Sequence, residues 1–168
     1  MYPPETAPRP PVARQRGKRP RAGIAALALL FLCAFGPSAL AMERAQAVGT
    51  IKTVTGEAFV ERLSERLPAS VGDYLLEGDT LVTGKNSSMG VIFRDDTLLS
   101  LGPVSRVTID KFVFDPAQEQ LDFLTRVNKG TVQFISGQIA KLKPGGMAVE
   151  TPLSTIGIRG TRFLIKVD

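Results

Sequence analysis

The 168-residue sequence has no histidine, no tryptophan and one cysteine. Without histidine the chain cannot build a Ser-His-Asp triad or a Cys-His pair, and it lacks the commonest nitrogen ligand for zinc. Cys33 lies in an apolar run near the N-terminus, so the rest of the chain has neither disulfides nor a thiol nucleophile. We therefore expect no metal site, no cofactor and no enzyme of these classes. Hydrolysis by paired carboxylates remains formally open.

Residues 1–41 are predicted to be a signal peptide. A basic, proline-rich head at residues 1–23 leads into an uncharged run at residues 22–42. Gly36-Pro37 would end a helix there, and Ala39-Leu40-Ala41 has the small-x-small pattern that signal peptidase accepts. Cleavage would release the following domain into the periplasm.

Other readings of the N-terminus stay open. Residues 22–42 are long enough to cross a bilayer as an uncleaved anchor, which would leave the domain attached to the inner membrane and facing the periplasm. Ala45-Gln46-Ala47 offers a second cleavage pattern. Lipidation of Cys33 is disfavoured because Leu32 stands where a small residue is expected. Each reading places the domain outside the cytoplasm.

The positive charge of the chain belongs to its first part. Of 21 Lys and Arg, six lie in residues 1–41, and of 16 Asp and Glu only Glu5 does, which leaves 15 of each sign. The exported domain is formally neutral. Nucleic-acid binding needs a basic surplus on one face, so nucleic acid is not an expected partner.

From residue 48 onward, apolar and polar residues alternate with period two. Segments of this kind are separated by Gly, Pro, Asn and Asp, and none carries a helical stripe longer than a turn or two. The pattern predicts one all-β domain over residues 48–168, an antiparallel β-sandwich of jelly-roll type with about ten short strands. The predicted strands include residues 106–114, 121–127, 131–136, 138–143, 154–158 and 161–167.

Three details of this pattern are specific enough to test. A phase slip near Lys111 predicts a β-bulge. Asn128-Lys129-Gly130 is typical of a tight hairpin between two strands. The phenylalanines in the alternating segments are predicted to form the core: Phe59, Phe93, Phe112, Phe114, Phe123, Phe134 and Phe163.

The segment Gly157-Ile158-Arg159-Gly160-Thr161 places two glycines around a lone arginine between two strand-like runs. Either Arg159 locks the final hairpin by bonding to carbonyls or an acid, or its planar guanidinium contacts a ligand or partner. The first reading is preferred because the flanking runs look like core strands. Gly157, Gly160 and Thr161 are then parts of a structural motif.

The acidic candidates all sit in turn-like sequences. Gly72-Asp73 and Gly78-Asp79 are typical turn dipeptides, in which the aspartate bonds its own backbone. Asp95 and Asp96 precede Thr97 in a similar setting, and we also consider both as contacts for a ligand or partner. A carboxylate-dependent glycan hydrolase would require two such acids across a groove, for example Asp95 with Asp73.

Taken in order, four segments resemble the FecR-like domain family. They are VGTIKTVTGEAFVER, VGDYLLEGDTLVTGKNSSMGVIFRDDTLLSLGPVSRVTI, NKGTVQF and VETPLSTIGIRGTRFLI, and they extend from about Val48 to Val167. Ser154 departs from the family pattern, in which alanine is common. In the best-known members this domain is the periplasmic part of an inner-membrane regulator that relays the ligand state of an outer-membrane transporter to a sigma factor. Those regulators carry a longer cytoplasmic segment than the basic head here, so the chain is similar to the stand-alone exported members.

The resemblance implies a non-catalytic binding or signalling module that contacts a protein partner or an envelope polysaccharide. The alternatives are a structural or accessory component of an envelope assembly and, less favoured, the glycan hydrolase. Tryptophan is absent and Tyr74 is the only tyrosine after residue 41, which lowers the expectation of a carbohydrate site built on aromatic platforms.

Overall fold

The computed structural model describes residues 44–159 and 162–168. The predicted signal peptide at residues 1–41, and Gly160 and Thr161 of the C-terminal motif, lie outside the described residues. The strands are β1 (Gly49–Thr55), β2 (Ala58–Arg62), β3 (Glu65–Pro68), β4 (Tyr74–Leu75), β5 (Thr80–Thr83), β6 (Ser88–Phe93), β7 (Leu98–Leu101), β8 (Arg106–Asp115), β9 (Gln120–Ile135), β10 (Met147–Glu150), β11 (Thr155–Gly157) and β12 (Arg162–Val167). A 3₁₀ helix spans Pro116–Gln118 and the short helix α3 spans Gln138–Leu142.

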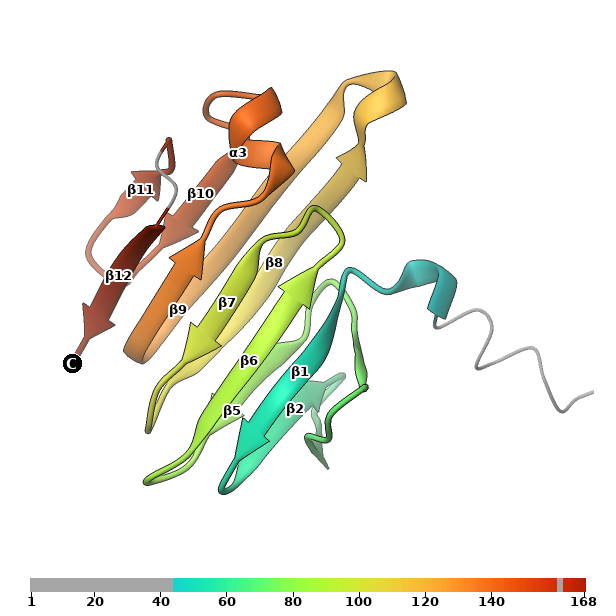
Figure 1. The fold of residues 1–168 in the computed structure, drawn as a ribbon. Coiled ribbons are helices and arrows are strands. Elements are labelled where there is room, and N and C mark those ends of the chain that lie inside the picture. The colour runs from blue at the N-terminus through green and yellow to red at the C-terminus, as the bar shows by residue number, and fades with distance from the viewer. Residues whose placement is uncertain (1–43, 160–161) are drawn as a thin grey trace, which may run out of the picture. The chain divides into compact units, whose positions relative to one another are not determined.

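The twelve strands form a sheet that folds over at β9 into two layers (Figure 1). The front layer runs β4-β1-β6-β7 and continues through the C-terminal half of β9 to β12. The back layer runs β3-β2-β5-β8 and continues through the N-terminal half of β9 to β10 and β11. Every strand pair is antiparallel except β9 with β10. The prediction of an all-β antiparallel sandwich is confirmed.

The core lies between the two layers and is built from the inward side chains of the alternating strands. Phe93 of the front layer meets two rings of the back layer, with ring centroids 5.6 Å from Phe112 and 4.6 Å from Phe123. Phe134 stacks on Phe163 at 4.9 Å. The core prediction fails for Phe59, because its neighbours on β2 point inward and Phe59 therefore faces outward, under the Arg66 guanidinium.

The predicted hairpin at residues 128–130 is wrong, because β9 continues through these residues without reversing direction. A two-residue hairpin turn of type I′ needs two consecutive residues with positive φ, and here only Gly130 has one, at 95°. The chain bends at Gly130 instead of reversing. Residues before the bend pair with β8, and residues after it pair with β7 and β12. The predicted bulge near Lys111 is confirmed by a register shift between Ile109 and Lys111.

The predicted strand at residues 138–143 is also wrong, since this segment contains α3. Its first turn is held by a residue far away in sequence: Asp95 accepts the N–H of Ile139 through its carboxylate and the N–H of Gln138 through its carbonyl. Ile139 is fully buried. A tertiary contact, absent from any local pattern, therefore decides the conformation.

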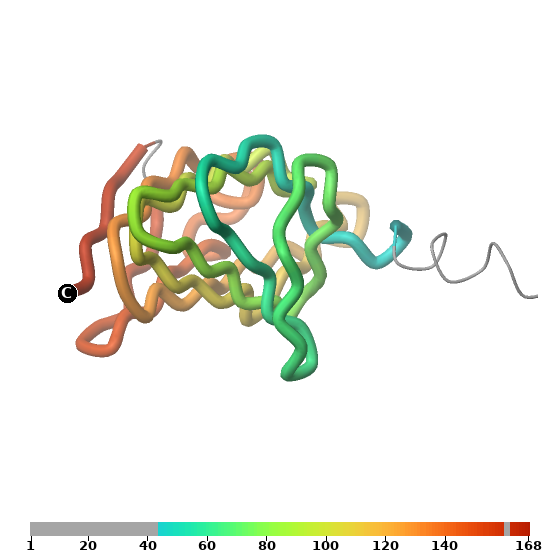
Figure 2. The backbone as a smooth tube through the Cα atoms, turned by 90° about the horizontal axis from the view of Figure 1, so that it is seen from below, coloured from blue at the N-terminus to red at the C-terminus, as the bar shows by residue number. Residues whose placement is uncertain are grey.

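Both ends of the sandwich have unpaired edge strands. β3 and β4 are the edges at one end, and β11 and β12 are the edges at the other. Figures 1 and 2 place β12 and residues 44–46 at opposite ends of the domain. β3 was not expected from the alternation; it follows a two-residue turn at Leu63-Ser64, where both φ angles are positive without a glycine.

Candidate functional site

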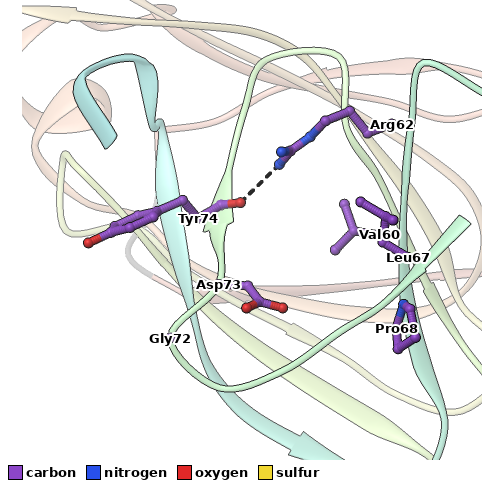
Figure 3. A pocket seen from close by; sticks show the side chains of 7 residues that line it. All are labelled: Val60, Arg62, Leu67, Pro68, Gly72, Asp73 and Tyr74. Atoms are coloured by element: carbon purple, nitrogen blue, oxygen red, sulfur yellow. Dashed lines mark hydrogen bonds between the residues drawn. The ribbon is translucent and has the colours of Figure 1, made fainter. Parts of the chain in front are cut away.

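The end of the sandwich between β3 and β4 contains a pocket of about 480 Å³ (Figure 3). Arg62 forms one wall, and its guanidinium makes two hydrogen bonds of 2.8 Å to the buried carboxylate of Asp79 and one of 3.0 Å to the Tyr74 carbonyl. Figure 3 shows that the Tyr74 ring points away from this pocket. Arg62 therefore fastens β2 to β4 and to the turn before β5, and its guanidinium is engaged by Asp79 and by the Tyr74 carbonyl.

The two Gly-Asp dipeptides occupy similar turns. Gly72 and Gly78 both have positive φ, at 99° and 90°. Each following aspartate accepts the backbone N–H three residues earlier, Asp73 from Ser70 at 2.7 Å and Asp79 from Leu76 at 2.8 Å. These carboxylates are thus engaged within the turns that they close.

Asp95 and Asp96 are neighbours in the turn between β6 and β7, but their surroundings differ. The Asp95 side chain is completely buried and accepts bonds from the N–H and hydroxyl of Thr97 and from the N–H of Ile139. Asp96 is exposed, and its carboxylate accepts the Gln138 side-chain amide at 2.8 Å. Of these two residues, only Asp96 therefore presents its carboxylate to solvent. Asp95 instead joins the turn before β7 to the start of α3 inside the domain.

The C-terminal motif does not form the expected final hairpin. β11 ends at Gly157 and pairs with β10 in the back layer, while β12 begins at Arg162 and pairs with β9 in the front layer. Gly157 and Arg162 therefore belong to different layers. Arg159 is exposed and makes no hydrogen bond or ion pair with any described residue, which does not support its reading as a lock on a hairpin.

Between β11 and β12 the sandwich is open, and two adjoining hollows of about 550 and 270 Å³ share Ile156 and Ile165 in their walls. We call this hollow the C-terminal groove. Its rim carries large apolar side chains in solvent, with Leu153 97% and Leu164 63% exposed. Arg159 lines the smaller hollow. Apolar side chains this exposed, gathered at unpaired strand edges, are typical of a binding surface.

The family model described as FecR protein matches residues 79–168. The chain belongs to the FecR family. The match includes β5 to β12 and the whole C-terminal groove, whereas the strands β1 to β4 precede it. No curated protein and no solved structure matches the chain.

FecR domains are associated with signalling and with the cell envelope. Within residues 44–159 and 162–168, no helix is both long and apolar enough to cross a membrane. The same part of the chain holds no cluster of His, Cys, Asp and Glu suited to a metal ion.

One carboxyl group of this FecR domain has a raised pKa. Asp110 is the extra residue of the β8 bulge, and burial raises its pKa, while the nearby Arg126 lowers it and Glu150 raises it. Its Oδ2 lies 3.6 Å from the Arg126 guanidinium and accepts no hydrogen bond from the described residues. Ionisation of Asp110 therefore lowers the stability of the folded domain.

We expect Asp110→Asn to stabilise the domain at neutral pH, because the asparagine amide carries no charge for burial to disfavour. Because the folded pKa of Asp110 lies above its unfolded value, the wild type loses stability as the pH rises through the window between them. Below the ordinary pKa of an aspartate, both states are protonated and the difference should vanish. Urea denaturation of both proteins at neutral and at acidic pH tests this. A variant that is less stable at neutral pH would show that attraction to Arg126 outweighs burial.

Proposed function

We propose that this FecR domain is a non-catalytic, extracytoplasmic binding and signalling module whose C-terminal groove holds an extended segment of a protein partner. One observation carries the proposal: the last two strands are edges of different layers, and exposed apolar side chains line the opening between them. The location outside the cytoplasm rests on the predicted export signal at residues 1–41.

The edge strand β12 supplies the backbone part of this recognition. Among the described residues it pairs with β9 alone, from Arg162 opposite Ile135 to Val167 opposite Gly130. Alternate N–H and C=O groups on its other side are free to pair with an added strand. An extended partner segment on this edge would place its side chains against Leu164 and the groove.

Charge favours an acidic partner segment. Arg159 and Arg162 are exposed and have no ion pair among the described residues, whereas Lys166 at the other end of β12 is paired with Asp168 at 2.9 Å. A guanidinium can donate two parallel hydrogen bonds to one carboxylate. The segment that fits is therefore an extended peptide with apolar residues and at least one carboxylate near Arg159.

The test is site-specific photo-crosslinking of the full chain in its native envelope. A photo-crosslinking phenylalanine analogue in place of Leu164 should capture one defined protein. The same analogue in place of Leu63, which is 95% exposed at the opposite end of the sandwich, is the control and should not. Arg159→Glu should lower the yield at position 164 by about tenfold or more, as expected for reversing one half of a charge-assisted pair. Arg66→Glu is the matched charge reversal away from the groove and should leave the yield unchanged.

The other outcomes would decide against the proposal. Equal capture at positions 164 and 63 would show that the groove is not the docking surface. If the captured protein is recovered only within a large complex that stays intact after dilution and washing, the chain is a permanent component of an envelope assembly. Capture of polysaccharide at position 164 in place of protein would assign the groove to a glycan.

A further inference from the structure

The outer face of the front layer carries a second feature, unrelated to the C-terminal groove. Thr50 of β1 lies opposite Tyr74 of β4 on one side and opposite Ile92 of β6 on the other. Their chain neighbours Ile51 and Phe93 point into the core, so these three side chains form a row on the solvent side. The row continues to Leu98 of β7, which faces Ile92 and is 39% exposed.

Three cations surround this row. Arg44, Lys52 and Arg94 line one pocket of about 630 Å³ together with Tyr74. All three are exposed, and their side chains make no hydrogen bond or ion pair with any described residue. Lys52 is the extra residue at a register shift between Ile51 and Thr53, and such a bulge redirects a side chain. We call Tyr74, Thr50, Ile92 and these three cations the basic platform.

The charge of the platform is local. The exported part of the chain has equal numbers of acidic and basic residues, so a surplus here is not a consequence of net charge. Asp96 is the one carboxylate among the residues lining the pocket, and it is bonded to the Gln138 amide. Three cations against one carboxylate give the pocket a positive potential suited to anions.

The residue types of the platform indicate which class of anion it would bind. A half-exposed tyrosine ring beside aliphatic side chains and cations matches the interface of a bilayer, where aromatic rings sit at headgroup level and Lys and Arg meet lipid phosphates. A free phosphate would need the cations but would leave the apolar row without a role.

The position of Arg44 in the chain supports the same ligand. Only Glu43 separates Arg44 from the uncharged run at residues 22–42, so at most about 7 Å of extended chain lies between the end of the run and Arg44. The headgroup layer on one side of a bilayer is about 5–8 Å thick. In a chain that retains the run as an anchor, Arg44 must therefore lie close to headgroup level.

We propose that the basic platform is a membrane-surface site that binds the headgroups of anionic phospholipids through Arg44, Lys52 and Arg94, with Tyr74 at the interface. The site holds this face of the domain against the bilayer. β12, which borders the C-terminal groove, lies at the far end of the domain from residues 44–46 (Figures 1 and 2), so the groove stays accessible to a partner.

Residues 42–168 are suited to the test, because every core side chain lies between Val48 and Ile165 and this part folds around its own core. In this fragment Tyr74 is the only tyrosine and there is no tryptophan, so tyrosine emission reports on the platform alone. The fragment is mixed with vesicles of phosphatidylcholine, with or without phosphatidylglycerol, and binding is measured by flotation and by acrylamide quenching of Tyr74.

We expect binding only to vesicles that contain phosphatidylglycerol, with Tyr74 protected from acrylamide. Each cation should contribute about fivefold to the partition coefficient, so Lys52→Gln with Arg94→Gln should lower it on the order of 30-fold. Binding should disappear at about 0.5 M salt, where the screening length is only a few ångströms. Lys85→Gln is the control: it removes one exposed cation from the turn at the other end of β6 and should leave binding unchanged.

Four results would overturn the proposal. Equal binding to both vesicle types would exclude headgroup charge as the cause. If Lys85→Gln lowered the partition coefficient as much as Lys52→Gln, binding would result from general electrostatic attraction and not from a defined site. Unchanged quenching of Tyr74 on bound vesicles would mean that another face meets the membrane. Full competition by inorganic phosphate or by an oligogalacturonate at low concentration would make the site one for a free anion.

Discussion

Alanine at position 130 is expected to destabilise the domain by about 3–5 kcal/mol, combining the strain of positive φ with overpacking against a backbone. Gly130 has φ 95°, and a Cβ there would lie 2.5 Å from the Cα of Ser105 and still closer to its hydroxyl oxygen. Ser105 cannot retreat easily, because its N–H is bonded to Thr83 and its hydroxyl accepts the N–H of Thr131. Since domains are commonly stable by only about 5–15 kcal/mol, a loss of this size removes much of the stability.

The matched control is Gly78→Ala. Gly78 has nearly the same backbone conformation, with φ 90°, but nothing lies within 4 Å of its added Cβ. It should therefore show the conformational cost alone, about 1–2 kcal/mol. Urea denaturation followed by circular dichroism gives both values. Equal losses in the two variants would mean that the close approach of β9 to Ser105 carries no energetic weight.

Asp95→Asn is expected to cost roughly 2–4 kcal/mol, because it turns one buried acceptor oxygen into a donor amide. The carboxylate accepts three hydrogen bonds, two from Thr97 and one from the backbone of Ile139 at the start of α3. An asparagine can accept on one side only, so at least one buried N–H or hydroxyl loses its partner. The substitution should destabilise both α3 and the turn before β7, because Asp95 bonds to residues of both.

The adjacent Asp96→Asn is the control for that experiment. Asp96 is exposed, has φ 66°, a conformation that asparagine tolerates, and makes one surface bond to Gln138. Its replacement should change the free energy of unfolding by less than about 0.5 kcal/mol. Hydrogen exchange at Ile139 provides a second measurement: protection should fall in Asp95→Asn and persist in Asp96→Asn. Similar behaviour of the two variants would contradict the assignment of Asp95 as the anchor of α3.

The strands could be predicted from the sequence wherever one face is buried and the other is wet, as in β6 and β8, because the period of two then appears directly in the residues. The bulge near Lys111 was visible for the same reason, as a slip in that period. The turn glycines before Asp73 and Asp79 were also readable, since a Gly-Asp pair favours a positive φ and a side chain bonded to its own backbone.

Other features depend on contacts with residues far away in the sequence, which a local sequence pattern does not reveal. Gly130 carries a turn signal, but it became a bend because β9 finds neighbours in both layers. The segment at residues 138–143 alternates like a strand, yet Asp95, more than forty residues earlier, supplies the acceptors that start a helix. Tyr74 was seen only as a scarce aromatic residue, and its role beside Arg44, Lys52 and Arg94 needed the register of β4, β1 and β6.

By itself, the sequence determined that this chain forms an all-β domain of the FecR family, neutral beyond its basic head and without the histidine and thiol chemistry of common enzymes. Composition, alternation and motif order suffice for those conclusions because each is a property of residues near one another in the chain. Only the tertiary structure decided that β11 and β12 join different layers, with Arg159 exposed beside an open groove, and that three separate cations share one face. The groove is made by strands that meet only when the sheet folds over at β9, and the cations are brought together by the pairing of β1 with β4 and β6 within the front layer.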